Sequence, residues 1–274
     1  MNMEIFQVFY KQDQDSKLDP SFIPYNNLDN PRPELCEWHA IEHIYQQQKE
    51  TDLDYWGVVS WKFGQKTGIT GDTFIDFVKK NPGYDVYIIN PAIINEAVFT
   101  NGWEQGNLYH PNLSQIANTF LKKIGHEVDV TASLIDRNST AYSNYFVASR
   151  DFWDQYTDFI NKIFEIAVHD KEFDYQVFAA GLSNYSMNKT LPNFAFLVER
   201  LLSTYIELNN IKSLGFTYTS NTAQEKYKSC FDTVKALSDL KMAITTHQSD
   251  ELYAIWDHFR RDFLQKNPGI LNLE

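Results

Sequence analysis

Two histidines with a glutamate between them form the pattern in this sequence that could most directly bind a metal. His39, Glu42 and His43 match the H-x-x-E-H pattern of inverted zinc peptidases. On a helix the two histidines would share one face, as zinc chelation requires, and Glu42 would supply the base. The alternative is that these polar side chains cover the solvent side of an amphipathic helix. Because the sequence offers no clear third ligand, a zinc hydrolase is the less favoured interpretation.

A second candidate site follows an apolar segment, Tyr84–Asn90, which predicts a buried strand. Ligands of open α/β sheets bind beyond the carboxyl ends of strands, so we expect Asn90 and the chain after it to line a crevice. The next segment, Asn95–Pro111, reads as a loop of polar and aromatic residues, the composition of a sugar or nucleobase site. An ordinary connector with inward-facing aromatics is the alternative. The candidates in this loop are Trp103, Glu104, Tyr109 and His110.

Two adjacent charges interrupt an otherwise apolar helical stretch, Phe194–Leu202. Glu199 and Arg200 could pair with each other or extend to the surface, as charged residues in such stretches usually do. If they face a cleft instead, Glu199 could act as a base or bind an acceptor. Cys36 and Cys230 both fall in helical patterns, which favours buried small side chains over nucleophiles.

Strands that alternate with helices must position these residues, and their order predicts an α/β fold with a mostly parallel sheet. The polar, proline-containing segment Lys11–Pro33 reads as a long loop. The expected strands are Glu4–Tyr10, Tyr55–Phe63, Tyr84–Asn90, Tyr145–Ser149 and Leu214–Thr219. The expected helices are Glu34–Gln48, Thr70–Lys80, Pro111–Ile124, Asp151–Val168, Asn193–Asn209, Thr222–Leu240 and Ser249–Gln265.

Composition excludes several classes of protein. The 274 residues carry a net charge of −12, which argues against nucleic acid as the main partner. Two cysteines cannot build a disulfide framework and suggest a reducing compartment. Since no apolar run approaches the roughly 20 residues of a transmembrane helix and no signal peptide is apparent, we expect a cytoplasmic protein.

The succession of four segments carries a resemblance to a known group. A segment from Glu34 to His39 precedes the strand Tyr55–Phe63, and Asn144–Ala148 then leads into an aromatic helix. A helix containing Phe196–Leu202 follows. In this order the segments resemble bacterial nucleotide-sugar-dependent glycosyltransferases of GT-A-like fold, found in surface-polysaccharide (capsule and lipopolysaccharide) assembly. The resemblance covers about residues 4–210.

The resemblance implies a GT-A-like, Rossmann-type sheet flanked by helices, with a helical C-terminal portion. One α/β domain would span residues 1–274, with a glycosyltransferase-like core over 1–210 and a mainly helical extension over 211–274. The implied reaction moves a sugar from a nucleotide donor to a saccharide acceptor, and the oligomeric state is left open. A non-catalytic carbohydrate-binding or scaffold protein of the same fold is the main alternative.

The resemblance also implies roles for particular residues. The counterpart of the group's Asp-x-Asp metal motif, Asp85-Val86-Tyr87, retains one carboxylate, so Asp85 is the candidate ligand for a divalent cation, Mn²⁺ or Mg²⁺. Where the group tends to carry a histidine and paired arginines, this chain has Ser60-Trp61-Lys62-Phe63. The donor-binding candidates are Asp85, Asn90, Lys62 and Arg200. The acceptor-binding candidates are Trp103, Tyr109 and Asn144, and the catalytic candidates are Glu199, Glu104 and His110.

Overall fold

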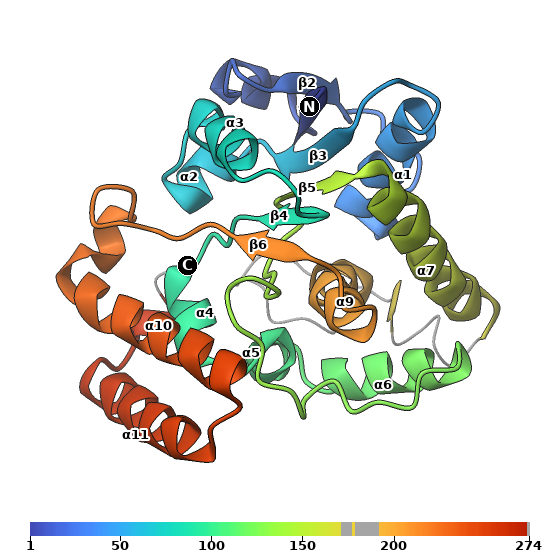
Figure 1. Cartoon of the computed structure of the whole chain (residues 1–274). Coiled ribbons are helices and arrows are strands. Elements are labelled where there is room, and N and C mark those ends of the chain that lie inside the picture. The colour runs from blue at the N-terminus through green and yellow to red at the C-terminus, as the bar shows by residue number, and fades with distance from the viewer. Residues whose placement is uncertain (171–176, 179–191, 273–274) are drawn as a thin grey trace.

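A single mixed sheet forms the centre of the protein. The structure, a computed structural model, describes residues 1–170, 177–178 and 192–272. Six strands of this described part lie in the order β2-β1-β3-β5-β4-β6 (Figure 1). β5 runs antiparallel to both neighbours, and the other neighbouring pairs are parallel, which confirms a mostly parallel α/β sheet. The strands are β1 (Met3–Phe9), β2 (Ile23–Asn26), β3 (Tyr55–Ser60), β4 (Val86–Ile88), β5 (Phe146–Ser149) and β6 (Ser213–Gly215).

Strand β2 lies in the segment that the sequence predicts to be a loop. It pairs in parallel with β1 along the edge of the sheet, where Ile23 aligns with Phe6 and Pro24 aligns with Gln7. Proline is tolerated at an edge because one side of the strand needs no hydrogen-bond donors. β2 is largely exposed, so it lacks the apolar alternation by which a strand is recognised.

Helices cover both faces of the sheet. In Figure 1, α1 and α7 lie on one side of the central strands and α2 and α3 lie on the other. Two apolar clusters correspond to these faces, one containing Phe6 and Trp56 and the other containing Ile5 and Val59. The helices are α1 (Glu37–Gln48), α2 (Phe63–Thr67), α3 (Gly71–Lys80), α4 (Ile93–Val98), α5 (Gly102–Tyr109), α6 (Leu113–Lys123), α7 (Arg150–His169), α9 (Asn193–Leu208), α10 (Phe231–His247) and α11 (Asp250–Lys266). The described residues also form four 3₁₀ helices, which are η1 (Gln12–Lys17), η2 (Pro33–Leu35), η3 (Glu225–Cys230) and η4 (Ile270–Asn272).

The loop predicted over Asn95–Pro111 is wrong, because α4 and α5 occupy most of it. Asn101 starts α5 by accepting hydrogen bonds from the backbone N–H groups of Trp103 and Glu104, at 2.9 and 3.0 Å. Two glycines in α5 lower its intrinsic helix propensity, so the helix depends on packing that the sequence pattern does not reveal.

The C-terminal part of the chain packs into the same body as the rest. β6 extends the sheet by pairing with β4, so the boundary expected near residue 210 precedes a strand of the central sheet. In α11 the indole Nε1 of Trp256 donates to the carbonyl of Ala97 at 3.0 Å. In α10 the buried Lys241 donates to the carbonyls of Glu96 and Phe99, at 2.7 and 2.8 Å. Within the described residues, none of the helices has the length and apolarity to cross a membrane.

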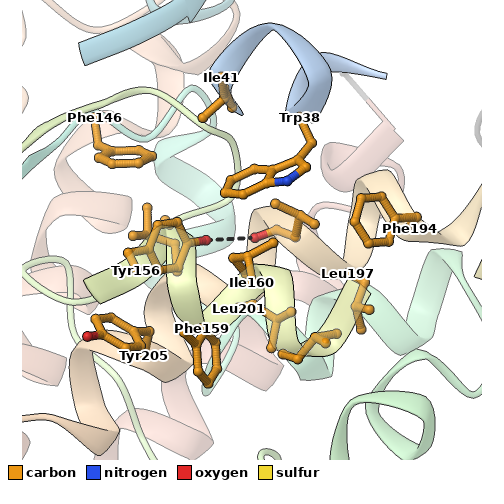
Figure 2. Close-up of a cluster of buried hydrophobic side chains, with 14 of the residues drawn as sticks. Trp38, Ile41, Phe146, Tyr156, Phe159, Ile160, Phe194, Leu197, Leu201 and Tyr205 are labelled. Atoms are coloured by element: carbon orange, nitrogen blue, oxygen red, sulfur yellow. Dashed lines mark hydrogen bonds between the residues drawn. The ribbon is translucent and has the colours of Figure 1, made fainter. Parts of the chain in front are cut away.

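A cluster of buried, mainly aromatic side chains packs α1, α7 and α9 against one another (Figure 2). Trp38 of α1 meets Tyr156 of α7 edge-on, with ring centroids 6.0 Å apart. The Tyr156 hydroxyl donates to the carbonyl of Val198 in α9 at 3.4 Å. Phe146 of β5 joins the same cluster, so these contacts fix the relative positions of three helices and one strand.

Candidate functional site

The strand order of the sheet indicates a candidate ligand site at the carboxyl ends of β1 and β3. The connection that leaves β1 leads to β2 on one side, whereas β3 lies on the other side of β1. In open α/β sheets this reversal of direction, beyond the carboxyl ends of the strands, is where ligands bind. The residues that follow these two strands are Tyr10 and Trp61.

An aromatic and cationic group, the switch-point platform, stands at this position. We define it as Tyr10, Lys17, Trp61 and Lys62. The rings of Tyr10 and Trp61 meet edge-on with centroids 6.4 Å apart. The ammonium groups of Lys17 and Lys62 lie 5.4 and 5.3 Å from the Trp61 ring. Tyr10 is 40% exposed, so a solvent-accessible aromatic surface and two cations meet at one point of an acidic protein.

A second group of polar residues, the carboxylate cluster, lies beside the platform. We define it as Glu37, Lys66, Asn144, Tyr145 and Glu199. The Asn144 amide donates a hydrogen bond to the Glu37 carboxylate. Burial of this carboxylate raises the pKa of Glu37, and the positive charge of Lys66 partly offsets that increase.

Tyr145 and Ser60 connect the cluster to the end of β3. The two hydroxyl oxygens are 2.6 Å apart, and both residues are buried. Ser60 is the last residue of β3, and its Oγ accepts from the backbone N–H of Lys62 at 3.3 Å. Burial is the main cause that raises the pKa of Tyr145; the positive charge of Lys66 lowers it, and the charges of Glu37 and Glu199 raise it further.

The backbone at Cys36 takes an unusual conformation where α1 begins. Its φ of 51° and ψ of −122° lie in a region that glycine prefers. Backbone strain of this kind persists only where the surrounding structure imposes it, and it is frequent at functional sites. Burial and the charges of Glu37, Glu199 and Glu34 raise the pKa of the Cys36 thiol to about 12, which disfavours the reactive thiolate at pH 7.

The buried core positions the carboxylates. Glu37 directly precedes Trp38, and Glu199 directly follows Val198, and both of these neighbours belong to the same buried apolar cluster. Asn144 stands two residues before Phe146 of the same cluster. Because the core fixes these three neighbours, the polar side chains have little freedom to separate.

The structure brings three of the predicted site residues to this edge of the sheet. Lys62 belongs to the switch-point platform, whereas Asn144 and Glu199 belong to the carboxylate cluster. Glu199 also approaches Arg200, with Oε2 and Nη1 3.9 Å apart.

Asp85 and Asn90 lie at opposite ends of β4. Asp85 is exposed and precedes the strand, so it lies at the amino edge of the sheet, away from the platform. Asn90 follows the strand and is buried, as expected for a residue at the carboxyl edge. Its amide donates to the carbonyl of Thr140 at 2.8 Å and accepts from the N–H of Tyr142 at 3.1 Å. Asn90 therefore holds the loop before β5 in place.

Arg200 and Trp103 occupy the packed interior. The Arg200 guanidinium donates to the carbonyls of Gly102 and Phe196, at 2.8 and 2.9 Å, and to the Gln105 side chain. Trp103 is 1% exposed, and its Nε1 donates to Thr204 Oγ1 at 2.8 Å. These contacts join α5 to α9, and no face of the Trp103 ring is available for a sugar to stack on.

The remaining candidates of the predicted loop also make structural contacts. Glu104 accepts from Thr100 Oγ1 at 2.8 Å and from Arg260 Nη1 at 3.0 Å, which links α5 to α11. The Tyr109 hydroxyl donates to the carbonyl of Leu271 at 3.2 Å. His110 is buried and stacks on Phe196 with centroids 3.8 Å apart. Burial, together with the nearby Arg200, lowers the pKa of His110 to about 4, so the ring is neutral at pH 7.

The histidine pair in α1 also has a defined geometry. The rings of His39 and His43 are nearly parallel, with centroids 6.4 Å apart, and His43 Nδ1 is hydrogen-bonded to the Tyr25 hydroxyl. Over the described residues, no group of three or more His, Cys, Asp or Glu side chains is arranged to hold a metal ion. The pair therefore lacks the third ligand of a catalytic zinc site in this part of the chain.

Two Asp-x-Asp triplets were missed in the sequence analysis, Asp13-Gln14-Asp15 and Asp52-Leu53-Asp54. The first lies in η1, just after β1, and the second precedes β3 at the amino edge. The Asp13 carboxylate is exposed and accepts from Lys17 Nζ at 2.9 Å. Asp85 lies at the opposite edge of the sheet from the platform, and neither triplet belongs to a group of three or more His, Cys, Asp or Glu side chains that could hold a metal among the described residues.

Glu37, Lys66 and Trp61 join the candidate site although the sequence patterns did not single them out. Glu37 lies within the segment Glu34–His39, Trp61 lies within Tyr55–Phe63, and Lys66 lies three residues beyond that segment. The available signal was the end of a buried strand, where polar and aromatic residues follow an apolar run. Both Tyr55–Phe63 and Tyr84–Asn90 carry this signal.

This chain is similar to a solved structure but matches no protein family and no curated protein. No protein-family profile matches the sequence, and no curated protein matches it. Among solved structures, it is similar to the apo structure of the WbbM bifunctional glycosyltransferase, with 16% identity and a TM-score of 0.48. The similarity covers 79% of this chain and 44% of the other, so this chain spans less than half the length of that glycosyltransferase.

Proposed function

We propose that this protein is a glycosyltransferase that moves a sugar from a nucleotide donor to a saccharide acceptor, in the cytoplasm and in the assembly of a bacterial surface polysaccharide. The observation that supports it is the switch-point platform, which combines an accessible aromatic surface with two lysines beyond the ends of β1 and β3. The resemblance of the sequence segments to GT-A-like glycosyltransferases supports the same assignment.

The chemistry of a nucleotide sugar suits this platform. A nucleobase can stack on an aromatic face, and such stacking contributes about 1–3 kcal/mol per base. The departing nucleoside diphosphate carries negative charge, which nearby lysine ammonium groups stabilise. Lys62 and Lys17 would supply this charge, and Lys66 of the carboxylate cluster lies four residues beyond Lys62. In the proposed mechanism these lysines stabilise the charge of the departing diphosphate, and a divalent cation, Mn²⁺ or Mg²⁺, could share that role.

Thermal-shift measurements with UDP-, GDP- and dTDP-sugars test the proposal. A ligand that binds only the folded state stabilises it by about 2.7 kcal/mol at 100 times its Kd, which raises Tm by several degrees. We expect at least one nucleotide sugar to produce this shift. Tyr10→Ala should weaken its binding about tenfold, the equivalent of about 1.4 kcal/mol.

Tyr253→Ala is the matched control. Tyr253 lies in α11 and is 37% exposed, close to the 40% of Tyr10, so removing its ring should leave nucleotide binding unchanged. The proposal fails if no nucleotide or nucleotide sugar raises Tm, with or without Mg²⁺ or Mn²⁺. A shift produced by saccharides but by no nucleotide would instead favour the non-catalytic carbohydrate-binding alternative.

A further inference from the structure

A cavity lies beyond the carboxyl ends of β4 and β6, where β5 and β4 separate it from the strands that lead to the switch-point platform. Its walls come from α4, from α10, which packs beside α4, and from the residues that follow β6 (Figure 1). It holds about 310 Å³ of empty space, including the part that is open to solvent. Pockets for small molecules begin at about 300 Å³, so this space suits a small ligand.

One part of the cavity wall is apolar. The ring of Phe216, which directly follows β6, is half-buried and meets Phe77 and Tyr218 edge-on, with centroids 5.3 and 5.1 Å apart. These contacts hold the ring in place, so an apolar ligand group can pack on a surface that is already formed. The apolar side chains that line the cavity are Ile93, Phe216, Phe231 and Val234.

The Arg137 guanidinium lines the cavity in a fixed position. Its Nη1 donates to Ser238 Oγ at 3.0 Å and to Asp239 Oδ1 at 2.8 Å. A Cβ atom on Gly215 would lie 1.9 Å from the backbone oxygen of Arg137, so glycine is needed for this segment to lie against β6. Within the described residues, Nε and Nη2 of Arg137 have no hydrogen-bond acceptor. The guanidinium is therefore held on one side and has donors left for a ligand.

The other charged groups of the wall favour an anionic ligand. Lys235 pairs with Asp239 through its ammonium group, which has three donors in total. Glu96 also lines the cavity, but it is 6% exposed, and the positive charge of Lys241 acts on it. Two cations, Arg137 and Lys235, thus line the cavity with one buried carboxylate. A ligand with acceptor oxygens and a negative charge matches the donors that remain.

We propose that this cavity is a binding site for a small organic carboxylate with an aromatic or other apolar body. The carboxylate accepts hydrogen bonds from Arg137 and Lys235, and the apolar body packs on Phe216 and Phe231. Inorganic phosphate would meet the same cations but would leave the apolar wall without a partner. Because the cavity shares no residue with the switch-point platform, this inference does not depend on the proposed function.

Calorimetric titration of the full chain with benzoate, benzamide and inorganic phosphate tests the proposal. Benzamide keeps the ring of benzoate without its charge, and phosphate keeps a negative charge without a ring. We expect benzoate to bind at least about tenfold more tightly than either, because only benzoate uses both parts of the wall. Benzoate should also raise Tm, since it binds the folded state.

Three variants locate the site. Arg137→Lys keeps the charge but loses the planar pair of donors, so the Kd for benzoate should rise about tenfold. Lys235→Met removes an exposed ammonium group and should raise this Kd about threefold or more. Arg261→Met is the matched control, because Arg261 is 73% exposed on α11 and pairs with Asp257. Its Kd for benzoate should equal that of the wild type.

Several outcomes would overturn the proposal. They are the absence of benzoate binding at millimolar concentrations, equal affinity for benzoate and benzamide, and binding of phosphate without benzoate. An unchanged benzoate Kd in Lys235→Met and Arg137→Lys would do the same. If Arg137→Lys fails to fold, Lys235→Met alone decides, since its ammonium group is at the surface. None of these results changes the interpretation of the nucleotide-sugar measurements.

Discussion

Individual residues of one type have different roles in this protein because their surroundings differ. Glu37 lies at the edge of the sheet, with an amide and a lysine nearby. Glu104 instead joins α5 to α11 through Arg260. The same contrast holds for tryptophan, since Trp61 is half-buried beside two lysines whereas Trp103 is fully enclosed. Residue type alone does not separate these cases.

His110 provides a prediction at this scale. Its pKa is about 4 in the folded protein and near 6.5 when unfolded, so the unfolded state binds more protons between these values. Stability contributed by the neutral ring is therefore complete above pH 6.5 and is lost as pH falls toward 4. The loss is about 3 kcal/mol. We expect urea unfolding of His110→Gln to depend less on pH over this window than the wild type does.

His258→Gln is the control for this titration, because His258 is exposed on α11 and its replacement should leave the pH dependence unchanged. If His110→Gln and the wild type lose stability equally between pH 7 and pH 4, the buried ring does not titrate as described.

At the scale of elements, the backbones of β3 and β5 approach each other closely at Gly57, where the two strands pair. A Cβ atom on Gly57 would lie 2.5 Å from the backbone oxygen of Phe146, so only glycine fits between the two strands. This close approach aligns the ends of β3 and β5, from which Ser60 and Tyr145 meet. The pairing of β3 with β5 therefore brings Ser60 next to Tyr145 of the carboxylate cluster.

Gly57→Ala should lower the free energy of unfolding by about 3 kcal/mol, because backbone must move to make room. Gly64→Ala in α2 is the matched comparison, since the nearest atom to its Cβ would be 3.8 Å away. Replacing this helical glycine should stabilise the protein by about 0.5–1 kcal/mol. Denaturant midpoints measure both changes, and equal effects of the two substitutions would contradict the close approach of β3 and β5.

At the scale of the whole molecule, the C-terminal helices complete the fold. Buried Lys241 and Glu96 join α10 to α4, and burial is the main influence on both, lowering the pKa of Lys241 to about 8 and raising that of Glu96. Ser238 donates to the Glu96 carboxylate at 3.1 Å. Because α10 buries a charged side chain against α4, it is part of the packed core and not a loosely attached C-terminal extension.

Lys241→Met should destabilise the protein by about 3 kcal/mol, because it removes the larger of the two positive-charge influences on the buried Glu96 side chain and leaves two carbonyls without this donor. Lys235, also in α10, pairs with Asp239 at the surface, so Lys235→Met should cost less than about 1 kcal/mol. Urea midpoints of the two variants test this ranking. Similar losses from both would show that the buried contacts do not brace the C-terminal helices.

The order and type of most elements followed from the sequence, because strand and helix periodicities are local properties of a chain. The predicted helix over Thr70–Lys80, for example, forms as α3, with the Thr70 side chain accepting from the N–H of Thr73. The pattern failed at β2, which is exposed, and at α5, which contains glycines. In both places distant packing, rather than local preference, decides the structure.

The candidate site divides in the same way. The sequence by itself indicated that polar residues beyond strand ends matter, and Lys62, Asn144 and Glu199 do lie at the carboxyl edge. Only the tertiary structure placed Asp85 at the opposite edge and joined Glu37 to Asn144, more than 100 positions away in the sequence. The physical reason is that burial, charge and hydrogen bonding depend on neighbours in space, and the chain sets these only when its helices pack on the sheet.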